Sequence, residues 1–203
     1  MYVARVLYPV RVLGPGDRIG IWFSGCEHGC KGCSNPELWH QEDQYKSSAD
    51  TIMKLVTSVA REHRIDGFTL TGGDPFYQPE ALKELIPRLK EYSDDILCYS
   101  GYEEKILREK YGDIVSSLAV LIDGRYIEER NTNAFLRGSD NQNIIIISEG
   151  LKEKYDSYLR DGHNEIQNFK SKDSVISVGI HGREYNDDLD KILSAKGLVI
   201  KQE

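Results

Sequence analysis

Hydrophobic and polar positions alternate with two different periods along most of this chain. Short runs that are apolar or alternate with period two predict strands, because the side chains of a strand point to its two faces in turn. Such strands are expected at residues 3–12, 18–23, 68–70, 95–99, 118–122 and 143–147. Apolar residues three and four apart predict amphipathic helices between several of them. This alternation of strand and helix favours an α/β fold, with parallel strands covered by helices.

Three helices are predicted between these strands. The first is expected to begin at a capping box formed by Ser47 and Asp50. The second begins at Pro79, a residue type that suits the first turn of a helix, and the third runs to about Tyr111. The apolar stripes expected to be buried are Ile52, Leu55, Val56 and Val59 in the first helix and Leu82, Leu85, Ile86 and Leu89 in the second.

The pattern changes after Ser148. A polar helix is expected at 149–162, a polar stretch at 161–173, a strand at 175–180, a helix at 185–195 and a final strand at 198–201. We therefore divide the chain into a main domain, 1–148, and a C-terminal extension, 149–203. The apolar runs of the extension are expected to pair with a sheet edge. The extension is predicted to serve partner engagement or sheet coverage, with His163 and His181 structural or solvated.

Four short motifs directly follow four of the predicted strands. They are a cysteine loop at 24–33, Gly-Gly-Asp-Pro at 72–75, Ser-Gly-Tyr at 100–102 and Asp-Gly-Arg at 123–125. Because the carboxyl ends of parallel strands meet at one rim, we expect the four motifs to form one site. Gly72 and Gly73 would let the backbone approach a ligand closely, and Asp74 would add a negative charge. A bulky side chain at Gly73 is expected to weaken ligand binding.

Three of the four cysteines lie within eight residues, as Cys26, Cys30 and Cys33. Three thiolates on one loop can bind three irons of a cubane cluster, which normally takes four cysteine ligands. The remaining iron would then be open to a substrate or cofactor. Cys98 lies in an apolar run and is predicted to be a buried structural cysteine. The open alternative is a zinc site in an interaction module without catalysis, with His28, His40 or Cys98 as fourth ligand.

The composition narrows the class of protein. The chain has 203 residues, of which 39% are hydrophobic and 29% charged, so one packed domain with an appended element is expected. A net charge of −7 argues against nucleic-acid binding, which uses a basic face. No run approaches the ~18 apolar residues of a transmembrane helix, so no membrane association is expected. Clustered cysteines without an export signal indicate the reducing cytoplasm.

The combined motifs resemble those of the radical SAM superfamily. The cysteine loop runs Ser-Gly-Cys-x3-Cys-x-Gly-Cys-x-Asn-Pro from residue 24, and Leu-Thr-Gly-Gly-Asp-Pro begins at residue 70. Gly-Pro-Gly at 14–16, Ser-Gly-Tyr at 100–102, Ile-Asp-Gly-Arg at 122–125 and Arg-Gly-Ser-x-Asn-Gln at 137–142 follow the same order as in one branch. That branch comprises the activating proteins of anaerobic (class III) ribonucleotide reductase. The resemblance covers about residues 5–148.

The resemblance implies a fold, two cofactors and a reaction. The fold would be an incomplete (β/α)6-type radical SAM barrel. Cys26, Cys30 and Cys33 would bind a [4Fe–4S] cluster whose open iron chelates S-adenosylmethionine (SAM). Reductive cleavage of SAM would give methionine and a 5′-deoxyadenosyl radical, which would abstract a hydrogen atom from a glycine of the partner enzyme. The electron would come from a one-electron donor such as flavodoxin or ferredoxin.

The resemblance also implies which residues contact SAM. Those expected at the methionyl end are Gly72, Gly73 and Asp74. Those expected at the adenosine are Gly32 and Ser34, which flank Cys33, itself counted among the cofactor-binding residues as well as the cluster ligands. Those expected at the ribose or the carboxylate, on the looser ground of strand-end position, are Ser100, Asp123 and Arg125.

Two departures from the branch bear on the partner. Asp140 stands where the branch usually has a serine, and the extension exceeds the usual length of these activases. The expected partner is a glycyl-radical enzyme, most simply anaerobic ribonucleotide reductase. The alternatives are another glycyl-radical enzyme, a small molecule or a peptide.

Overall fold

The computed structural model of the chain describes residues 1–170 and 175–195. The predicted final strand at 198–201 lies outside the described residues. The main sheet has six strands in the order β1-β2-β3-β4-β5-β6. Its strands are β1 Val3–Val10, β2 Arg18–Phe23, β3 Gly67–Gly72, β4 Ile96–Tyr99, β5 Val120–Asp123 and β6 Asn143–Ile146. The helices are α1 Ala49–Ala60, α2 Pro79–Leu89, α3 Glu104–Ser116, α4 Lys152–Asp161 and α5 Tyr185–Ala195, and a hairpin is formed by β7 Ile166–Lys170 and β8 Val175–Gly179.

The expectation of parallel strands is correct for the centre of the sheet and wrong for its edges. Strands β2 to β5 are parallel, whereas β1 and β6 each pair antiparallel with their neighbour. The reason is the connection, since parallel neighbours need a long crossover. Only a short turn with Gly14 and Gly16 at positive φ joins β1 to β2, and no α-helix separates β5 from β6. The fold is therefore a mixed α/β sheet.

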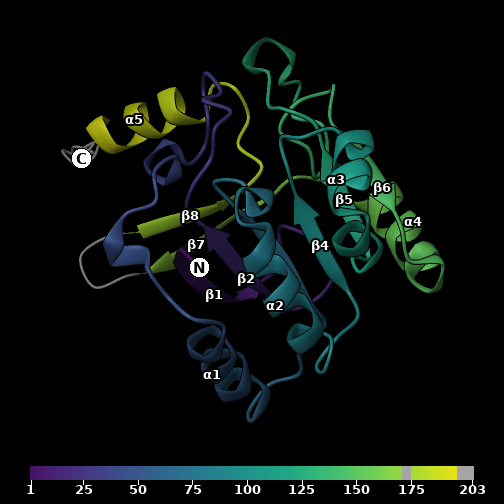
Figure 1. The fold of residues 1–203 in the computed structure, drawn as a ribbon. Coiled ribbons are helices and arrows are strands. Elements are labelled where there is room, and N and C mark those ends of the chain that lie inside the picture. The colour runs from purple at the N-terminus through teal and green to yellow at the C-terminus, as the bar shows by residue number, and fades with distance from the viewer. Residues whose placement is uncertain (171–174, 196–203) are drawn as a thin grey trace.

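The sheet is buried on both faces. Helices α1, α2 and α3 cover one face, where Ile19, Ile21 and Phe23 of β2 join the largest core cluster. On the other face, Trp22 packs with residues of β1 and of the hairpin, and Leu97 packs with Tyr155 of α4. In Figure 1 the hairpin accordingly lies beside β1 and β2. The extension thus covers the sheet's second face at these points, which is one of the two roles expected for it.

The helix predictions hold in type but not in every detail. The N-cap of α1 is Ser48, whose side chain accepts a hydrogen bond from the Thr51 backbone, and not Ser47. Leu55 is 47% exposed, because the helix turns Ile52, Met53 and Val56 toward the core instead. All four predicted stripe residues of α2 are buried. Helix α3 continues to Ser116 beyond the predicted end, but its backbone is non-helical at Tyr111 (φ −141°, ψ 41°).

The extension differs from prediction in its pairing. Strand β7 lies inside the stretch predicted to be only polar, and β8 pairs with β7 in a separate two-stranded sheet. In the described residues, neither strand joins an edge of the main sheet. Strand β6 is at most half-buried because it forms an edge, although its run of isoleucines is typical of a buried strand. In the part of the chain described, no helix is long and apolar enough to cross a membrane.

Candidate active site

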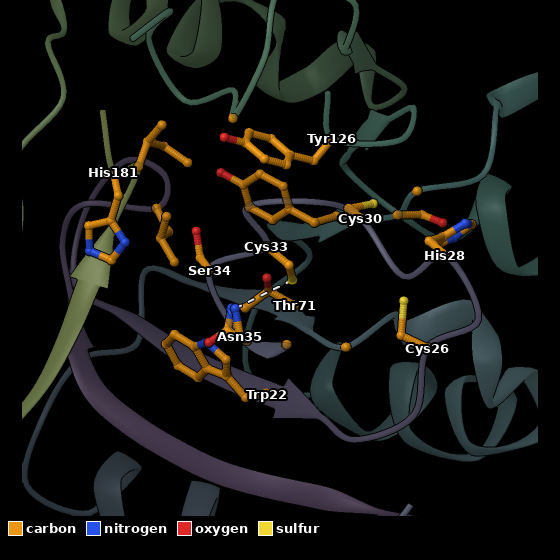
Figure 2. A pocket seen from close by; sticks show the side chains of 18 of the residues that line it. Trp22, Cys26, His28, Cys30, Cys33, Ser34, Asn35, Thr71, Tyr126 and His181 are labelled. Carbon is orange, nitrogen blue, oxygen red and sulfur yellow. Dashed lines mark hydrogen bonds between the residues drawn. The ribbon is translucent and has the colours of Figure 1, made fainter. Parts of the chain in front are cut away.

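A cavity of about 190 Å³ lies where the predicted strand-end motifs meet. Its walls come from the loop after β2, the ends of β3, β4 and β5, and the hairpin. Figure 2 shows the cysteine side chains at one side of this cavity and His181 at the other. Within the described residues, the lining contains no Lys, Arg, Asp or Glu side chain. All four motifs therefore contribute residues to the cavity as expected, although Asp74, Pro75, Tyr102, Asp123 and Arg125 do not line it.

The cysteine loop is held by backbone hydrogen bonds to residues 38–39. Gly25 N–H donates to Leu38 O at 2.8 Å, and Cys26 N–H donates to Trp39 O at 2.9 Å. Gly25 has φ +112°, a conformation that favours glycine. Beyond it, all three loop cysteines are free thiols that line the cavity. Cys98, in contrast, is fully buried in the core beneath, which confirms the prediction of a buried cysteine there.

Burial favours the protonated form of two of these thiols, Cys26 and Cys33, when no metal is bound. It raises the pKa of Cys26 to about 11, with a smaller contribution from the Asp74 carboxylate. It also raises the pKa of Cys33, although the Asn35 backbone N–H, 3.4 Å from Cys33 Sγ, and the Trp39 indole oppose this rise. Metal binding must therefore displace these protons, since the thiolate is the ligand.

The donor set suits a four-iron cluster with one iron open. Three thiols of one loop face one cavity, and the fourth cysteine is enclosed in the core. In the described residues, no group of three or more His, Cys, Asp or Glu side chains converges as a single metal ion requires. A cubane cluster does not require such convergence, because each thiolate binds a different iron. The indole Nε1 of Trp39 is buried and makes no hydrogen bond of normal geometry, but it lies close enough to Cys33 to oppose the rise of that thiol's pKa.

Of the three candidate zinc ligands, only His28 lines the cavity. Its Nε2 lies 2.9 Å from Asp74 Oδ2, and its ring meets the edge of Tyr102 with centroids 4.5 Å apart. The side chain of His28 is thus oriented by two neighbours. The residue connects the cysteine loop with the Gly-Gly-Asp motif, a role that the sequence alone did not indicate.

Gly72 and Gly73 line the cavity and also pack directly against neighbouring backbone, Gly72 against β2 and Gly73 against the cysteine loop. A Cβ at Gly73 would lie 2.5 Å from Gly25 O and 2.8 Å from Leu38 O. At Gly72, which has φ +111°, a Cβ would lie 2.4 Å from Phe23 O. Both positions therefore require glycine for the approach of two backbones, in addition to the ligand approach that we predicted.

Asp74 does not line the cavity, although we predicted it to be a binding residue. Its carboxylate is 1% exposed and accepts hydrogen bonds from Phe76 N–H at 2.9 Å, Gly101 N–H at 2.8 Å and Ser100 Oγ at 3.1 Å. With the His28 contact, these bonds tie three of the converging motifs together. In this structure Asp74 therefore positions the walls of the cavity.

The remaining predicted residues divide into two groups. Ser34 and Ser100 line the cavity, whereas Gly32, Asp123 and Arg125 do not. Asp123 accepts hydrogen bonds from Glu104 N–H at 2.6 Å and from Asn143 Nδ2 at 2.8 Å, so it links α3 to β6. It shares a neighbouring surface groove with Arg125.

Several lining residues were not predicted from the sequence. They are Leu13, Trp22, Asn35, Trp39, Thr71, Tyr99, Gly101, Gly124, Tyr126, Gly138, Gln142 and residues 177–181. Asn35, Thr71, Gly101, Gly124, Gly138 and Gln142 belong to the recognised motifs, so motif membership could have identified them. Nothing in the sequence of 177–181 indicates a place in the site.

Comparison with known proteins agrees with this arrangement. A family described as "4Fe-4S single cluster domain" matches residues 12–145. The chain is 31% identical over 150 residues to the anaerobic ribonucleoside-triphosphate reductase-activating protein of Enterobacteria phage T4, which covers 71% of this chain and 94% of the phage protein. The protein of the same name from Vibrio cholerae is 34% identical over 145 residues, covering 68% and 93%. The one from Escherichia coli K12 is 31% identical, covering 66% and 92%. The chain therefore belongs to the 4Fe-4S single cluster domain family, among proteins related to the anaerobic ribonucleoside-triphosphate reductase-activating proteins.

Proposed function

We propose that this chain is a radical SAM enzyme that installs a glycyl radical on anaerobic ribonucleotide reductase. The observation that carries the proposal is the joint position of three free cysteine thiols and the Gly72–Gly73 backbone on one cavity. The relatives' names supply the partner. The mixed sheet with four parallel central strands supports an incomplete (β/α)6-type radical SAM barrel as the frame.

Cys26, Cys30 and Cys33 would hold a [4Fe–4S] cluster, and the cavity would leave its fourth iron free for SAM. When bound, the reduced cluster would supply the one electron needed to cleave a C–S bond of SAM to methionine and a 5′-deoxyadenosyl radical, which would take a hydrogen atom from the partner's glycine. The protein's part is to bind, to orient and to exclude competing hydrogen donors.

The walls of the cavity suit that part. Gly72 and Gly73 bring backbone groups to the cavity surface, where they can bind the polar methionyl end of SAM. The Asp74 hydrogen bonds hold the Gly-Gly motif, the Ser100–Gly101 turn and His28 in one arrangement. Because these walls are already ordered, less conformational entropy is lost when a ligand binds. A one-electron donor such as flavodoxin or ferredoxin, in the reducing cytoplasm, would complete the system.

Anaerobic reconstitution tests the proposal. The protein should bind about four irons per chain and become brown, and with SAM and a chemical reductant it should form methionine and 5′-deoxyadenosine. Cys30→Ala should lose both properties, whereas Cys98→Ala should keep them because Cys98 lies in the core. A colourless protein that binds zinc would refute the proposal in favour of the interaction module.

The partner is tested separately. Incubation with anaerobic ribonucleotide reductase should produce a glycyl radical detectable by electron paramagnetic resonance. Cleavage of SAM without that radical would point instead to another glycyl-radical enzyme, a peptide or a small molecule.

A further inference from the structure

The C-terminal hairpin contributes a wall to the active-site cavity. Residues 177–181, at the end of β8 and just beyond it, line the same cavity as Cys26, Cys30 and Cys33. Figure 2 shows His181 on the opposite side of this cavity from Cys26. The family match ends at residue 145, so this wall lies outside the part of the chain that the family shares.

Contacts with the main domain fix the position of this wall. The Gln167 side chain donates from Nε2 to Pro9 O at 2.7 Å and accepts at Oε1 from Arg11 N–H at 3.0 Å. Asn131 Nδ2 donates to His181 O at 3.0 Å. Val178 is 3% exposed and belongs to the same buried cluster as Trp22. Hydrogen bonds and apolar burial together hold the hairpin in a fixed position against the main domain, so residues 177–181 form a permanent wall of the cavity.

The hairpin wall has no Asp, Glu, Lys or Arg side chain, and its polar side-chain groups come from Ser177 and His181 beside the apolar Val178 and Ile180. The His181 ring stacks on Tyr185 with centroids 4.2 Å apart, and Ser177 Oγ lies 2.7 Å from Tyr185 Oη and 3.4 Å from His181 Nε2. Burial lowers the pKa of His181, which favours the neutral imidazole. Since the rest of the described lining also lacks Asp, Glu, Lys and Arg side chains, this end suits an uncharged ligand with hydrogen-bonding groups, such as a peptide main chain.

We propose that the hairpin wall, through Ser177 and His181, binds the main chain of the partner segment that gives up its hydrogen atom. This rests on the proposed function, in which the cysteine side of the cavity holds the cluster and the methionyl group. With the adenosine expected at Ser34, we assign the hairpin side, which lies opposite the cysteines, to the hydrogen donor. There the glycine Cα–H bond breaks homolytically, the hydrogen atom joins C5′ of the deoxyadenosyl radical, and the unpaired electron stays on Cα. The electron consumed in cleaving SAM comes from the one-electron reductant.

The experiment follows a deuterium atom. The full-length, cluster-loaded protein receives SAM, dithionite and anaerobic ribonucleotide reductase prepared with Cα-deuterated glycine, and deuterium in 5′-deoxyadenosine is measured. The double substitution Ser177→Ala, His181→Ala should lower deuterium transfer about tenfold, the effect of losing one or two hydrogen bonds. Iron content and SAM affinity, measured by equilibrium dialysis, should stay within about twofold of the parent. Asn168→Ala is the matched control, because Asn168 pairs with Ser177 across the hairpin but is exposed.

Three results would overturn the inference. Unchanged deuterium transfer in the double variant would show that the wall does not contact the donor. A parallel loss of SAM affinity would assign the wall to the cofactor. SAM cleavage by the parent without deuterium transfer would show that the reductase's glycine is not the donor. A parent that assembles a cluster but cleaves no SAM would instead refute the proposed function itself.

Discussion

Replacing Asp95 should destabilise the protein strongly, because its side chain balances a buried cation. Arg18 is fully buried, and its Nη2 lies 3.1 Å from Asp95 Oδ1. Tyr155 Oη donates to the same carboxylate at 2.6 Å, and Lys154 Nζ lies 2.6 Å from Asp95 Oδ2. Asp95→Ala would leave the Arg18 guanidinium without its anion and Tyr155 without its acceptor. Removing one partner of a buried ion pair typically costs about 3–5 kcal/mol.

That cost is a large part of the roughly 5–15 kcal/mol by which such a domain is stable. Urea denaturation of the metal-free protein, followed by circular dichroism, measures it directly. Asp94→Ala is the matched control, because the neighbouring Asp94 side chain is 81% exposed. Its ion pair is a weak surface one, with Lys90 Nζ 3.8 Å from Asp94 Oδ1. Its substitution should change the free energy of unfolding by less than about 0.5 kcal/mol. A loss below about 1 kcal/mol for Asp95→Ala would refute the ion-pair argument.

The same carboxylate predicts an acid dependence of stability. Burial alone would raise the pKa of Asp95, but Arg18 and the hydrogen bonds from Lys154 and Tyr155 outweigh burial and lower it. A carboxyl whose pKa is lower in the folded state stabilises the fold above its unfolded pKa, and this contribution is lost as the pH falls below about 4. The stability difference between the parent and Asp95→Asn should therefore shrink on acidification. A difference that stays constant down to about pH 2 would contradict this assignment.

Three further predictions concern the site. Gly73→Val should lower SAM affinity and also cluster content, because the added side chain meets the carbonyls of Gly25 and Leu38. Dialysis measures SAM affinity and iron analysis measures cluster content; unchanged values would show that the contact is unimportant. Trp39→Phe should lower the reduction potential of the cluster in a redox titration, since an indole N–H beside the Cys33 sulfur favours the more negative reduced form. His28→Ala should leave cluster content near that of the parent while weakening SAM binding, because His28 contacts Asp74; full SAM affinity would show that this contact is dispensable.

The central elements could be predicted because local pattern and burial agree there. Strand β2 matches its predicted range, since its six residues are apolar, glycine or the paired Arg18 and all are buried. The directions of β1 and β6 were not predictable from their own residues. They depend on connections that contain no crossover helix, which the spacing of motifs indicates only indirectly. Strand β7 was missed because its alternation of Ile166, Gln167, Asn168, Phe169 and Lys170 is mostly polar, and Gln167 anchors it through a side-chain amide.

In the candidate site, too, residues within local motifs could be predicted from the sequence, whereas contacts between distant segments could not. The three loop cysteines and Gly72–Gly73 could be predicted as site residues from their residue types, their spacing and their positions after strands. The structure has all of them lining the cavity. The Asp74 carboxylate accepts hydrogen bonds from Ser100 and Gly101, which are distant in sequence and come together only in the folded chain. The hairpin wall is the extreme case, because 177–181 reach the cavity through β1, Trp22 and Asn131, far away in sequence. A segment that lines a site but lies far away in sequence from the site's motifs carries no recognisable motif of its own. Its contribution to the site can be identified only from the three-dimensional structure.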